Sequence, residues 1–446
     1  MTDELREERR TPPLVGVVAD DVTGCGDIGT MFAKHGYAVR IFTSTAPMDL
    51  VATRIAAART DVAVVDTDSR YDRREVAYDK VRGATRMLAA AGAGVFYKKT
   101  CSVFRGNIGA EFDAMLDELG ESFGAVVAAF PKNERVTRHG IQYVHGKPLA
   151  ESHFARDPVH PRTQSSLVAD LASQTSRTVE NIDIDIVRRG AKKIRAALED
   201  ARHRGVAYAL CDAELQDDLH EIALAAAGAR VLLGASALAE ELARVWDRVS
   251  PFDAPAEAPE PHTKARHPTL VIAGSVMPQT RAQISALEES GCRVLVLESE
   301  GALERPDDAA VQLGDEAAAV LAEGRNVAVR SQSSPEDVDR ARELGGRSDL
   351  DPIAVSRRIS EVLARVADRA IERSSSQRLV VLGGDTSAAV CARLGIMEML
   401  VLDELDAGVP VTASVGERAR PLRLVLKAGS FGAPNFLVRA IARLSR

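Results

Sequence analysis

The strongest constraint on the fold of this 446-residue chain is a repeated alternation of short apolar runs and longer amphipathic stretches. The apolar runs are rich in Val and Ile and are continuous, which predicts strands buried on both faces of a sheet. Strand, helix and strand in succession indicate parallel βαβ units, so the sequence predicts an α/β fold with mainly parallel sheets. In the first part of the chain, the expected strands are Leu14–Ala19, Asp61–Asp66, Val95–Lys98, Ala125–Phe130 and Tyr208–Cys211, and the expected helices are Arg74–Ala90 and Gly109–Leu119.

One stretch, Ser250–Pro268, interrupts this alternation. It contains five prolines and almost no large apolar residue, which is typical of an exposed, semi-extended linker. A chain of 446 residues also exceeds the roughly 250–300 at which a single core divides. We therefore expect one α/β domain at 12–249, a linker at 250–268, a second α/β domain at 269–446, and a ligand cleft between the domains.

The second domain repeats the same pattern. Its expected strands are Thr269–Ala273, Arg293–Glu298, Asn326–Arg330, Arg378–Leu382, Met399–Leu402 and Leu422–Lys427. Helices are expected from about Gln279, at Ala354–Ser374 and at Ala388–Leu394, and Asp337–Asp351 is expected to be a polar surface excursion.

Composition excludes several classes of protein. Hydrophobic residues make up 46% of the chain and charged residues 27%, which are globular values. A net charge of -7 argues against a nucleic-acid partner, and no apolar run approaches the roughly 18 residues of a membrane span. The polar N-terminus lacks the apolar core of a signal peptide, so a cytoplasmic location is expected, and a homodimer is the expected assembly because two-fold dimers are the commonest oligomers.

The metal-binding residue types are scattered. The five cysteines are far apart and form no CxxC pair, which argues against a disulfide framework and a cysteine-rich zinc site. Spacings of six, eight and seven residues match no compact zinc pattern, and we expect no metal site there. These spacings separate His139, His145, His153 and His160, in a loop expected to lie on the substrate side with Arg135.

Ligands of an open parallel sheet bind beyond the carboxyl ends of its strands, so the loops at those positions are the candidate ligand sites. Asp20 and Asp21 end the first strand and precede a glycine-rich turn that contains Thr23. Such carboxylates can accept a hydroxyl proton or bind sugar hydroxyls. Arg70 follows a second strand and could clamp a substrate carboxylate. The alternatives are a helix N-cap for the first loop and an Arg–Asp surface pair for the second.

A third loop concentrates positive charge between a strand and a helix, which suits an anionic substrate; a solvated basic loop is the alternative. Its candidate substrate-binding residues are Lys98, Lys99, Ser102, Arg105 and Asn107.

Three glycine-bearing turns in the second domain each follow a strand and precede a helix. Helix N-termini gathered around one crevice suit the phosphates of a nucleotide, although ordinary turns are the alternative for each loop alone. The candidate nucleotide-binding residues are Gly274, Ser275, Gly383, Gly384, Asp385, Thr386, Ser387, Lys427, Gly429 and Ser430.

In these loops the sequence resembles the four-carbon acid sugar kinase family over nearly the whole chain. The resemblance implies a sugar-acid-binding N-terminal domain and a C-terminal domain that binds ATP with Mg²⁺. It also implies substrates such as threonate, erythronate and 3-oxo-tetronate, phosphorylated on the terminal hydroxyl. The motifs that carry it, in the family's order, are Ala19–Gly24, Thr67–Arg70, Arg105–Glu111, Gly383–Ser387 and Lys427–Gly432.

The expected mechanism follows from these motifs. Arg70 and Lys99 face the substrate carboxylate, Asp20 or Asp21 accepts the hydroxyl proton, and closure of the two domains completes the site. The chain departs from the family at Cys101, where a carboxylate is common, and at Val103, where threonine is common. The substrate could therefore differ from the usual tetronates.

Three alternatives stay open. The first is a non-catalytic sensor of a sugar acid and ATP, which the change at Cys101 leaves open. The second is an NAD-dependent sugar-acid dehydrogenase, against which the missing GxGxxG motif counts. The third is cysteine chemistry at Cys101, for which the sequence offers no base and orienting partner.

Overall fold

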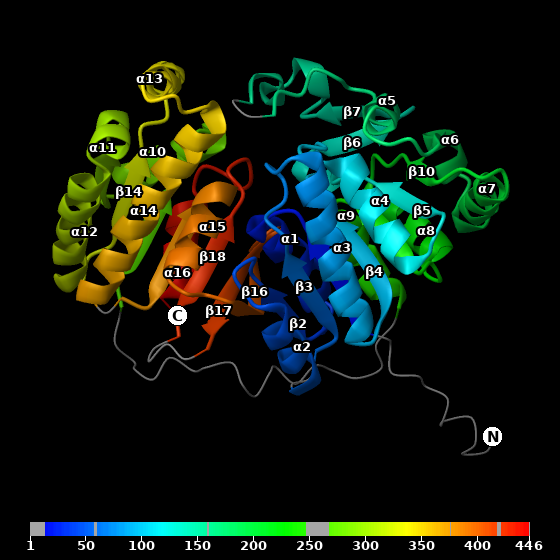
Figure 1. The fold of residues 1–446 in the computed structure, drawn as a ribbon, viewed down its shortest axis with the longest axis horizontal. Coiled ribbons are helices and arrows are strands. Elements are labelled where there is room, and N and C mark those ends of the chain that lie inside the picture. The colour runs from blue at the N-terminus through cyan, green and yellow to red at the C-terminus, as the bar shows by residue number, and fades with distance from the viewer. Residues whose placement is uncertain are drawn as a thin grey trace.

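The computed structural model describes residues 14–57, 60–157, 160–246, 267–374, 376–416 and 421–445. Two lobes lie side by side, the N-terminal lobe (blue to green) on the right of Figure 1 and the C-terminal lobe (yellow-green to red) on the left. A single 15-stranded sheet runs through both. Most of the linker predicted at 250–268 lies outside the described residues, so that prediction stays a prediction.

The N-terminal lobe contains eight parallel strands of this sheet. Neighbouring residues of a strand point to opposite faces, so Val17 and Val18 of the first strand belong to two different hydrophobic clusters. In order across the sheet, the strands are β2 (Val39–Phe42), β3 (Val62–Asp66), β1 (Leu14–Ala19), β4 (Ala93–Lys99), β11 (Val231–Gly234), β5 (Gly124–Val127), β10 (Tyr208–Cys211) and β9 (Val179–Ile182).

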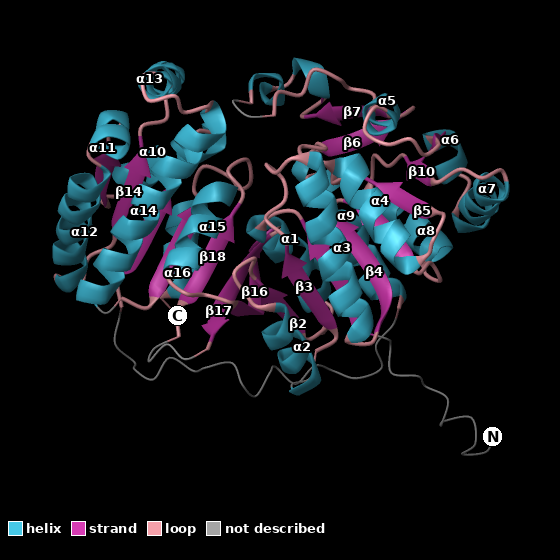
Figure 2. Ribbon diagram, viewed as in Figure 1, coloured by secondary structure: helices cyan, strands magenta, loops and turns pink. Residues whose placement is uncertain are grey.

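Helices cover both faces of these strands, which explains why the strands are apolar throughout (Figure 2). One group, α3 and α4, packs against β1 and β4, and α1, α9, α8 and α7 form a second group in which each helix contacts the next. The helices are α1 (Val22–Ala33), α2 (Met48–Ala57), α3 (Arg74–Ala90), α4 (Ile108–Leu119), α5 (Leu167–Ala172), α6 (Ile184–Val187), α7 (Ala191–His203), α8 (Gln216–Ala226) and α9 (Ala237–Val245).

A small antiparallel sheet lies at the upper edge of the lobe in Figure 2, beyond the carboxyl ends of the parallel strands. It consists of β6 (Arg135–Arg138), β7 (Ile141–Val144) and β8 (Lys147–Pro148). It therefore covers the end of the sheet at which ligands are expected.

The C-terminal lobe repeats the α/β arrangement, which confirms the predicted fold class. Its parallel strands, in order, are β13 (Arg293–Leu297), β14 (Val327–Ser331), β12 (Thr269–Ala273), β15 (Arg378–Leu382) and β18 (Arg423–Lys427). Its helices are α10 (Pro278–Glu289), α11 (Ser299–Glu304), α12 (Pro306–Ala322), α13 (Pro335–Gly346), α14 (Pro352–Ser374), α15 (Gly384–Arg393) and α16 (Phe436–Leu444).

Two local predictions in this lobe need correction. Most of the expected surface excursion at Asp337–Asp351 is helix α13. Ser334 caps its first turn by accepting from the amide of Asp337, whose side chain accepts in return from the amide of Ser334. The helix expected at Ala388–Leu394 begins earlier, at Gly384, because the glycine turn passes directly into it.

An antiparallel hairpin joins the two lobes into one sheet. Its strands are β16 (Glu398–Asp406), which pairs with β2, and β17 (Val409–Val415), which pairs with β18. A strand was expected at Met399–Leu402, but β16 is longer and completes the sheet of the opposite lobe. Next to this seam, Glu398 forms a buried ion pair with Arg40 of β2.

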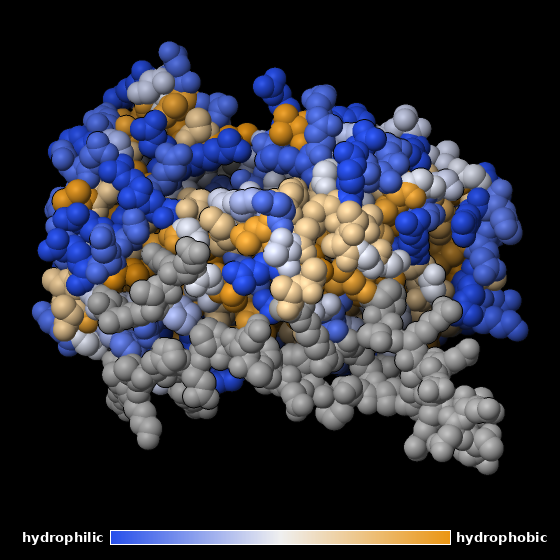
Figure 3. Space-filling view, turned by 60° about the horizontal axis from the view of Figure 1, so that its bottom comes forward, coloured by the Kyte–Doolittle hydropathy of each residue, from blue (hydrophilic) through white to orange (hydrophobic). Residues whose placement is uncertain are grey.

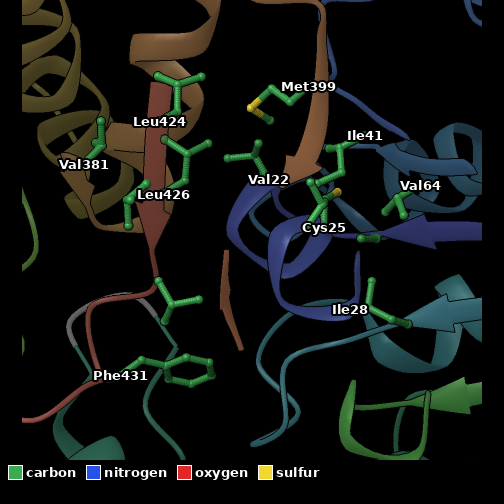
Figure 4. Packing of buried hydrophobic residues seen from close by; sticks show 14 of the residues in the cluster. Val22, Cys25, Ile28, Ile41, Val64, Val381, Met399, Leu424, Leu426 and Phe431 are labelled. Carbon is green, nitrogen blue, oxygen red and sulfur yellow. The ribbon is translucent and has the colours of Figure 1, made fainter. Parts of the chain in front are cut away.

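Helix α1 packs against the C-terminal lobe as well as its own. It contacts β16, β17, β18 and α15, and one hydrophobic cluster extends from α1 into both lobes (Figure 4). Val22 and Cys25 of α1 lie beside Met399 in this cluster. The approach to β17 is close, since a Cβ on Gly26 would lie 3.0 Å from the Cγ of Pro410. The start of α1 is therefore fixed between the lobes.

On the face drawn in Figure 3, hydrophilic residues cover the outer rims of both lobes, and hydrophobic residues are exposed mainly between them. Within the described part of the chain, the structure contains no helix that is both long enough and apolar enough to cross a bilayer.

Candidate functional site

Two adjoining pockets open where the lobes meet. The large pocket encloses about 1120 Å³ of empty space, part of it open to solvent, and the small pocket about 350 Å³. Residues of both lobes line each of them, and the two linings share Asp21, Thr23, Arg70, Arg105, Ala428 and Ser430.

Three neighbouring strands of the C-terminal lobe, β12, β15 and β18, end at the large pocket. Their loops lie so close together that side chains are excluded. A Cβ on Gly274 would lie 2.1 Å from Thr386 Oγ1, and a Cβ on Gly429 would lie 2.0 Å from Ser275 Oγ. Gly383 has φ +118°, a conformation that favours glycine. The structure thus brings eight of the predicted nucleotide-binding residues together in the lining: Gly274, Ser275, Gly383, Gly384, Asp385, Thr386, Gly429 and Ser430.

The other two candidates lie behind these loops. The Lys427 amine donates to the carbonyls of Ala428 and Phe431, both at 2.8 Å, and to that of Gly429 at 3.3 Å. Burial lowers the pKa of this amine to about 7. Lys427 therefore shapes the loop from beneath. Ser387 is fully buried and lines neither pocket.

The far end of the large pocket is apolar. Val338 and Ala341 of α13 and Val355 and Ile359 of α14 belong to its lining. The sequence prediction missed this surface because it did not recognise α13 as a helix. An apolar cleft beside a set of glycine turns suits a nucleotide, with its base between the helices and its phosphates on the turns.

On the N-terminal side, Arg70 is bound by both acids of the first motif. Its guanidinium lies 2.7 Å from Asp20 Oδ2 and 2.7 Å from Asp21 Oδ1. Four of its five N–H groups donate to these carboxylates, which leaves little capacity to clamp a substrate. In this structure Arg70 therefore holds the two acids in position, and its role as the carboxylate clamp stays a prediction.

Asp21 is the member of the acidic pair that reaches the pockets. It caps α1 by accepting from the amide of Gly24 at 2.9 Å, and it accepts from the Thr23 hydroxyl at 2.6 Å. Burial alone would raise its pKa, but the charges of Arg70 and Lys99 lower the pKa of Asp21 to about 2. Asp20 is fully buried and lines neither pocket.

Two of the predicted substrate-binding residues, from the end of β4 and the loop that follows it, line neither pocket and instead have a structural role. Lys98 is fully buried, and its amine lies 2.9 Å from Glu111 Oε2. The Asn107 amide donates to the carbonyls of Ser69 at 3.1 Å and Asp72 at 2.9 Å. Asn107 thus holds the loop that carries Arg70, and Lys98 supports it indirectly, since Glu111 also accepts from the Ser69 hydroxyl. Burial that depends on distant partners cannot be read from the local pattern, which explains why both were expected at the surface of the site.

The remaining candidates of this loop line the small pocket: Lys99, Ser102 and Arg105. Lys99 lies 3.2 Å from Asp27 Oδ2, and burial raises the pKa of Asp27. Asp27 was not among the predicted site residues, although it lies on α1 only six residues beyond Asp21, the N-cap of that helix.

Cys101 and Arg135 also line the small pocket. The Nε of Arg105 donates to Cys101 Sγ at 3.4 Å. Burial opposes ionisation of this thiol, but the charges of Arg105 and Arg70 prevail and lower its pKa to about 7. The departure from the family pattern at Cys101 therefore lies in the lining of the small pocket. The sequence predicted Arg135 only as part of a substrate-side loop. Its individual role was not predicted, because the residues that surround it in the fold are distant from it in the sequence.

Comparisons with known proteins agree with this arrangement. The chain matches the family models of a sugar-binding N-terminal domain over residues 15–242 and of a nucleotide-binding C-terminal domain over residues 270–437. It is 32% identical to a 3-oxo-tetronate kinase of Pseudomonas fluorescens, with 97% of each chain covered. It is 33% identical to a D-threonate kinase of Bordetella bronchiseptica, with 96% of each covered.

A solved structure supports the fold assignment. A Haemophilus influenzae protein of family DUF1537 has a TM-score of 0.67 and 25% identity, covering 96% of this chain and 99% of its own. Together, the two family models and the nearly full-length kinase relatives show that this chain belongs to the four-carbon acid sugar kinase family and is a phosphotransferase that acts on a hydroxyl group.

Proposed function

We propose that this enzyme transfers the γ-phosphoryl group of ATP to a hydroxyl of a four-carbon sugar acid such as threonate, erythronate or 3-oxo-tetronate. The observation that carries the proposal is the shared lining of the two pockets. Glycine turns and an apolar cleft fill one end of the large pocket, the small pocket is rich in arginine and lysine, and Asp21 belongs to both. A nucleotide and an anionic acceptor bound in these pockets would meet at Asp21.

The nucleotide would lie with its base between α13 and α14 and its phosphates on the three glycine turns. Helix α15 begins at Gly384, where free backbone N–H groups and the helix dipole favour negative charge. A Cβ on Gly384 would lie 3.0 Å from Asp21 Oδ2, so the helix start and this carboxylate are close neighbours. The terminal phosphate would therefore be directed toward the acceptor.

Mg²⁺ would accompany ATP. The ion is usually held by phosphate oxygens and one or two carboxylates, and Asp385 is a carboxylate of the large pocket beside the glycine turns. One oxygen of Asp385 accepts from Ser356 Oγ at 2.9 Å, which fixes the orientation of the carboxylate. When bound, Mg²⁺ would neutralise charge on the transferring phosphates.

The chain's own contribution would be alignment and proton acceptance. A loose phosphoryl-transfer transition state demands little of a base, so a low-pKa carboxylate can orient the hydroxyl and accept its proton late. Asp21 has the required position, and the acceptor hydroxyl would take the place of one of the donors that its oxygens accept from in this structure, such as the Thr23 hydroxyl. Lys99 and Arg105 add positive charge near the acceptor. A cytoplasmic homodimer is part of this proposal, and light scattering of the purified enzyme would test the assembly.

The proposal is tested by ADP release, coupled to an optical readout, with Mg-ATP and a panel of four- to six-carbon sugar acids. We expect release with at least one tetronate and none with the corresponding tetritol. Tight binding of ATP and an acid without ADP release would instead identify a sensor. A change in NADH absorbance with sugar acids would identify a dehydrogenase.

Cys101 should make substrate affinity depend on pH. The thiol is flanked by Arg70, Arg105 and Arg135, and its pKa is about 7. As the pH rises through this value the thiolate forms and offsets the positive charge that attracts the substrate. We expect KM for the acid to rise up to roughly tenfold between pH 6 and 8.5, with kcat changing less.

The matched variant Cys101→Ser keeps the size of the side chain and removes its titration. Its KM for the acid should be nearly constant over the same pH range, whereas KM for ATP should follow the wild-type values. A wild-type KM that is flat over this range would exclude ionisation of Cys101 as a determinant of affinity.

A further inference from the structure

The cations of the small pocket differ in how they are paired. Arg70 is bound by Asp20 and Asp21, Lys99 lies 3.2 Å from Asp27, and Arg105 lies 2.9 Å from Asp157. Arg135 is different. Its polar contacts among the described residues are two serine hydroxyls, at Ser102 and Ser430, and no carboxylate.

Arg135 is nevertheless deeply buried, with 5% of its surface exposed. Its guanidinium carbon lies 5.3 Å from the ring centre of Phe154 and 5.1 Å from that of Phe431, so aromatic rings of both lobes flank it. Nη1 donates to Ser102 Oγ, and Nη2 donates to Ser430 Oγ at 2.9 Å. Nε is buried without a hydrogen-bond partner among the described residues.

This arrangement leaves donors available in a fixed plane. A guanidinium has five N–H groups, and two of those of Arg135 are used. A buried charge that is not paired with an acid is costly, because burial disfavours the charged form. Burial accordingly lowers the pKa of Arg135 to about 10. An anion that enters the small pocket would remove this cost and could bind the planar fork through two parallel hydrogen bonds.

We propose that Arg135 binds the carboxylate of the sugar-acid substrate and thereby gives the enzyme its preference for acids over polyols. The inference rests on the proposed function and adds to it the residue that recognises the acid group. It replaces Arg70 and Lys99, the residues expected from the sequence, because their charges are already matched by aspartates. Arg105, whose Nε donates to Cys101 Sγ, provides a second cation in the same lining.

A phosphate is the other anion that such a fork could bind. Position favours the carboxylate. The glycine turns and the start of α15 lie in the large pocket, where they would provide the phosphate site. Arg135, by contrast, lines only the small pocket. Arg135 also contacts Ser430 and Phe431 of the loop after β18. Because Ser430 lines the large pocket as well, substrate binding at Arg135 would affect the position of a loop that binds the nucleotide.

The test compares Arg135→Met and Arg135→Lys with the wild type. Arg138→Met is the matched control, because Arg138 lies on the same strand β6, is exposed, and lines neither pocket. Calorimetric titration with the tetronate identified by ADP release measures binding without catalysis. We expect Arg135→Met to bind the acid at least about thirtyfold more weakly, since a charged two-point contact is lost.

Binding measurements on the other variants, and with ATP, distinguish a carboxylate site at Arg135 from a phosphate site. Arg135→Lys keeps the charge without the fork and should bind the acid with intermediate affinity, while Arg138→Met should match the wild type. Binding of ATP should change less than threefold in all variants, and thermal unfolding should confirm that each is folded. Unchanged binding of the acid by folded Arg135→Met, or a loss of ATP affinity in its place, would refute the assignment.

Failure of the proposed function would look different. In that case the wild type itself would neither bind nor phosphorylate any acid of the panel, and both proposals would fall. If the wild type phosphorylates an acid and Arg135→Met binds it normally, only the assignment of Arg135 is overturned.

Discussion

Replacing Asp21 by asparagine should lower kcat for sugar-acid phosphorylation by at least about a hundredfold, because the variant loses both the alignment of the reacting hydroxyl and the group that accepts its proton. Asp21 lies where the two pockets join and faces the start of α15. Asparagine keeps an oxygen that can cap α1, but it cannot accept the hydroxyl proton and weakens the pairing with Arg70. Steady-state kinetics with saturating ATP measures the loss.

Asp20→Asn is the natural comparison, because Asp20 also binds Arg70 but lines neither pocket. Its kcat should fall much less than that of Asp21→Asn at comparable thermal stability. Equal losses in the two variants would mean that the pair acts only by positioning Arg70, and a kcat within threefold of the wild type for Asp21→Asn would remove Asp21 from the chemistry.

The depressed pKa of Asp21 also predicts the direction of a stability change. Its folded-state pKa is about 2, below the value of 3.8 for an unperturbed carboxyl. The unfolded state therefore binds more protons between these values, and the stabilisation is present above pH 3.8 and is lost as the pH falls through about 2. The wild type should lose this contribution on acidification, whereas Asp21→Asn has none to lose.

Substitution of Gly429 by alanine should raise KM for ATP by at least about tenfold, because a steric clash of this kind forces loops or side chains to move. The new Cβ would lie 2.0 Å from Ser275 Oγ and 2.9 Å from Ser275 Cβ. The turns after β12 and β18 would then have to separate, and both belong to the lining of the large pocket. Nucleotide titration by fluorescence or calorimetry measures the effect.

A second change offers a rescue. Ser275→Gly removes both clashing atoms, so the double variant should bind ATP more tightly than Gly429→Ala alone. Gly83→Ala is a suitable control, since a Cβ on Gly83 of α3 meets nothing within 4 Å. Loss of ATP affinity that persists unchanged in the double variant would show that the clash with Ser275 is not its cause.

Local features of the sequence predicted much of the fold. Tyr208–Cys211, Thr269–Ala273 and Arg378–Leu382 are strands with the predicted bounds, because a strand buried on both faces leaves a continuous apolar run. The hairpin β16–β17 was not predicted. Its pairing with β2 is a contact between segments distant in the chain, and no local pattern encodes such a partner.

In the candidate site, too, the features encoded by local sequence were predicted, and those that depend on distant contacts were not. The glycine turns were recognisable, since each lies at a strand end and a close approach or a positive φ requires glycine there. Lys427 looks like a phosphate ligand in the sequence, but it is buried beneath its own loop. The importance of Arg135 depends on Ser102, Phe154 and Phe431, which come from three separate segments, so it emerges only in the folded chain.

The shared sheet has a consequence for how this chain is made. Arg40 of β2 and Glu398 of β16 are 358 residues apart, so at the usual rates of synthesis roughly 20 to 70 seconds pass between their emergence from the ribosome. Throughout that time, the edge of β2 that β16 later covers has not met its partner. Open strand edges are templates for pairing with other chains. The nascent N-terminal lobe would therefore be most prone to aggregate late in translation, and a chain truncated before β16 would keep that edge exposed permanently.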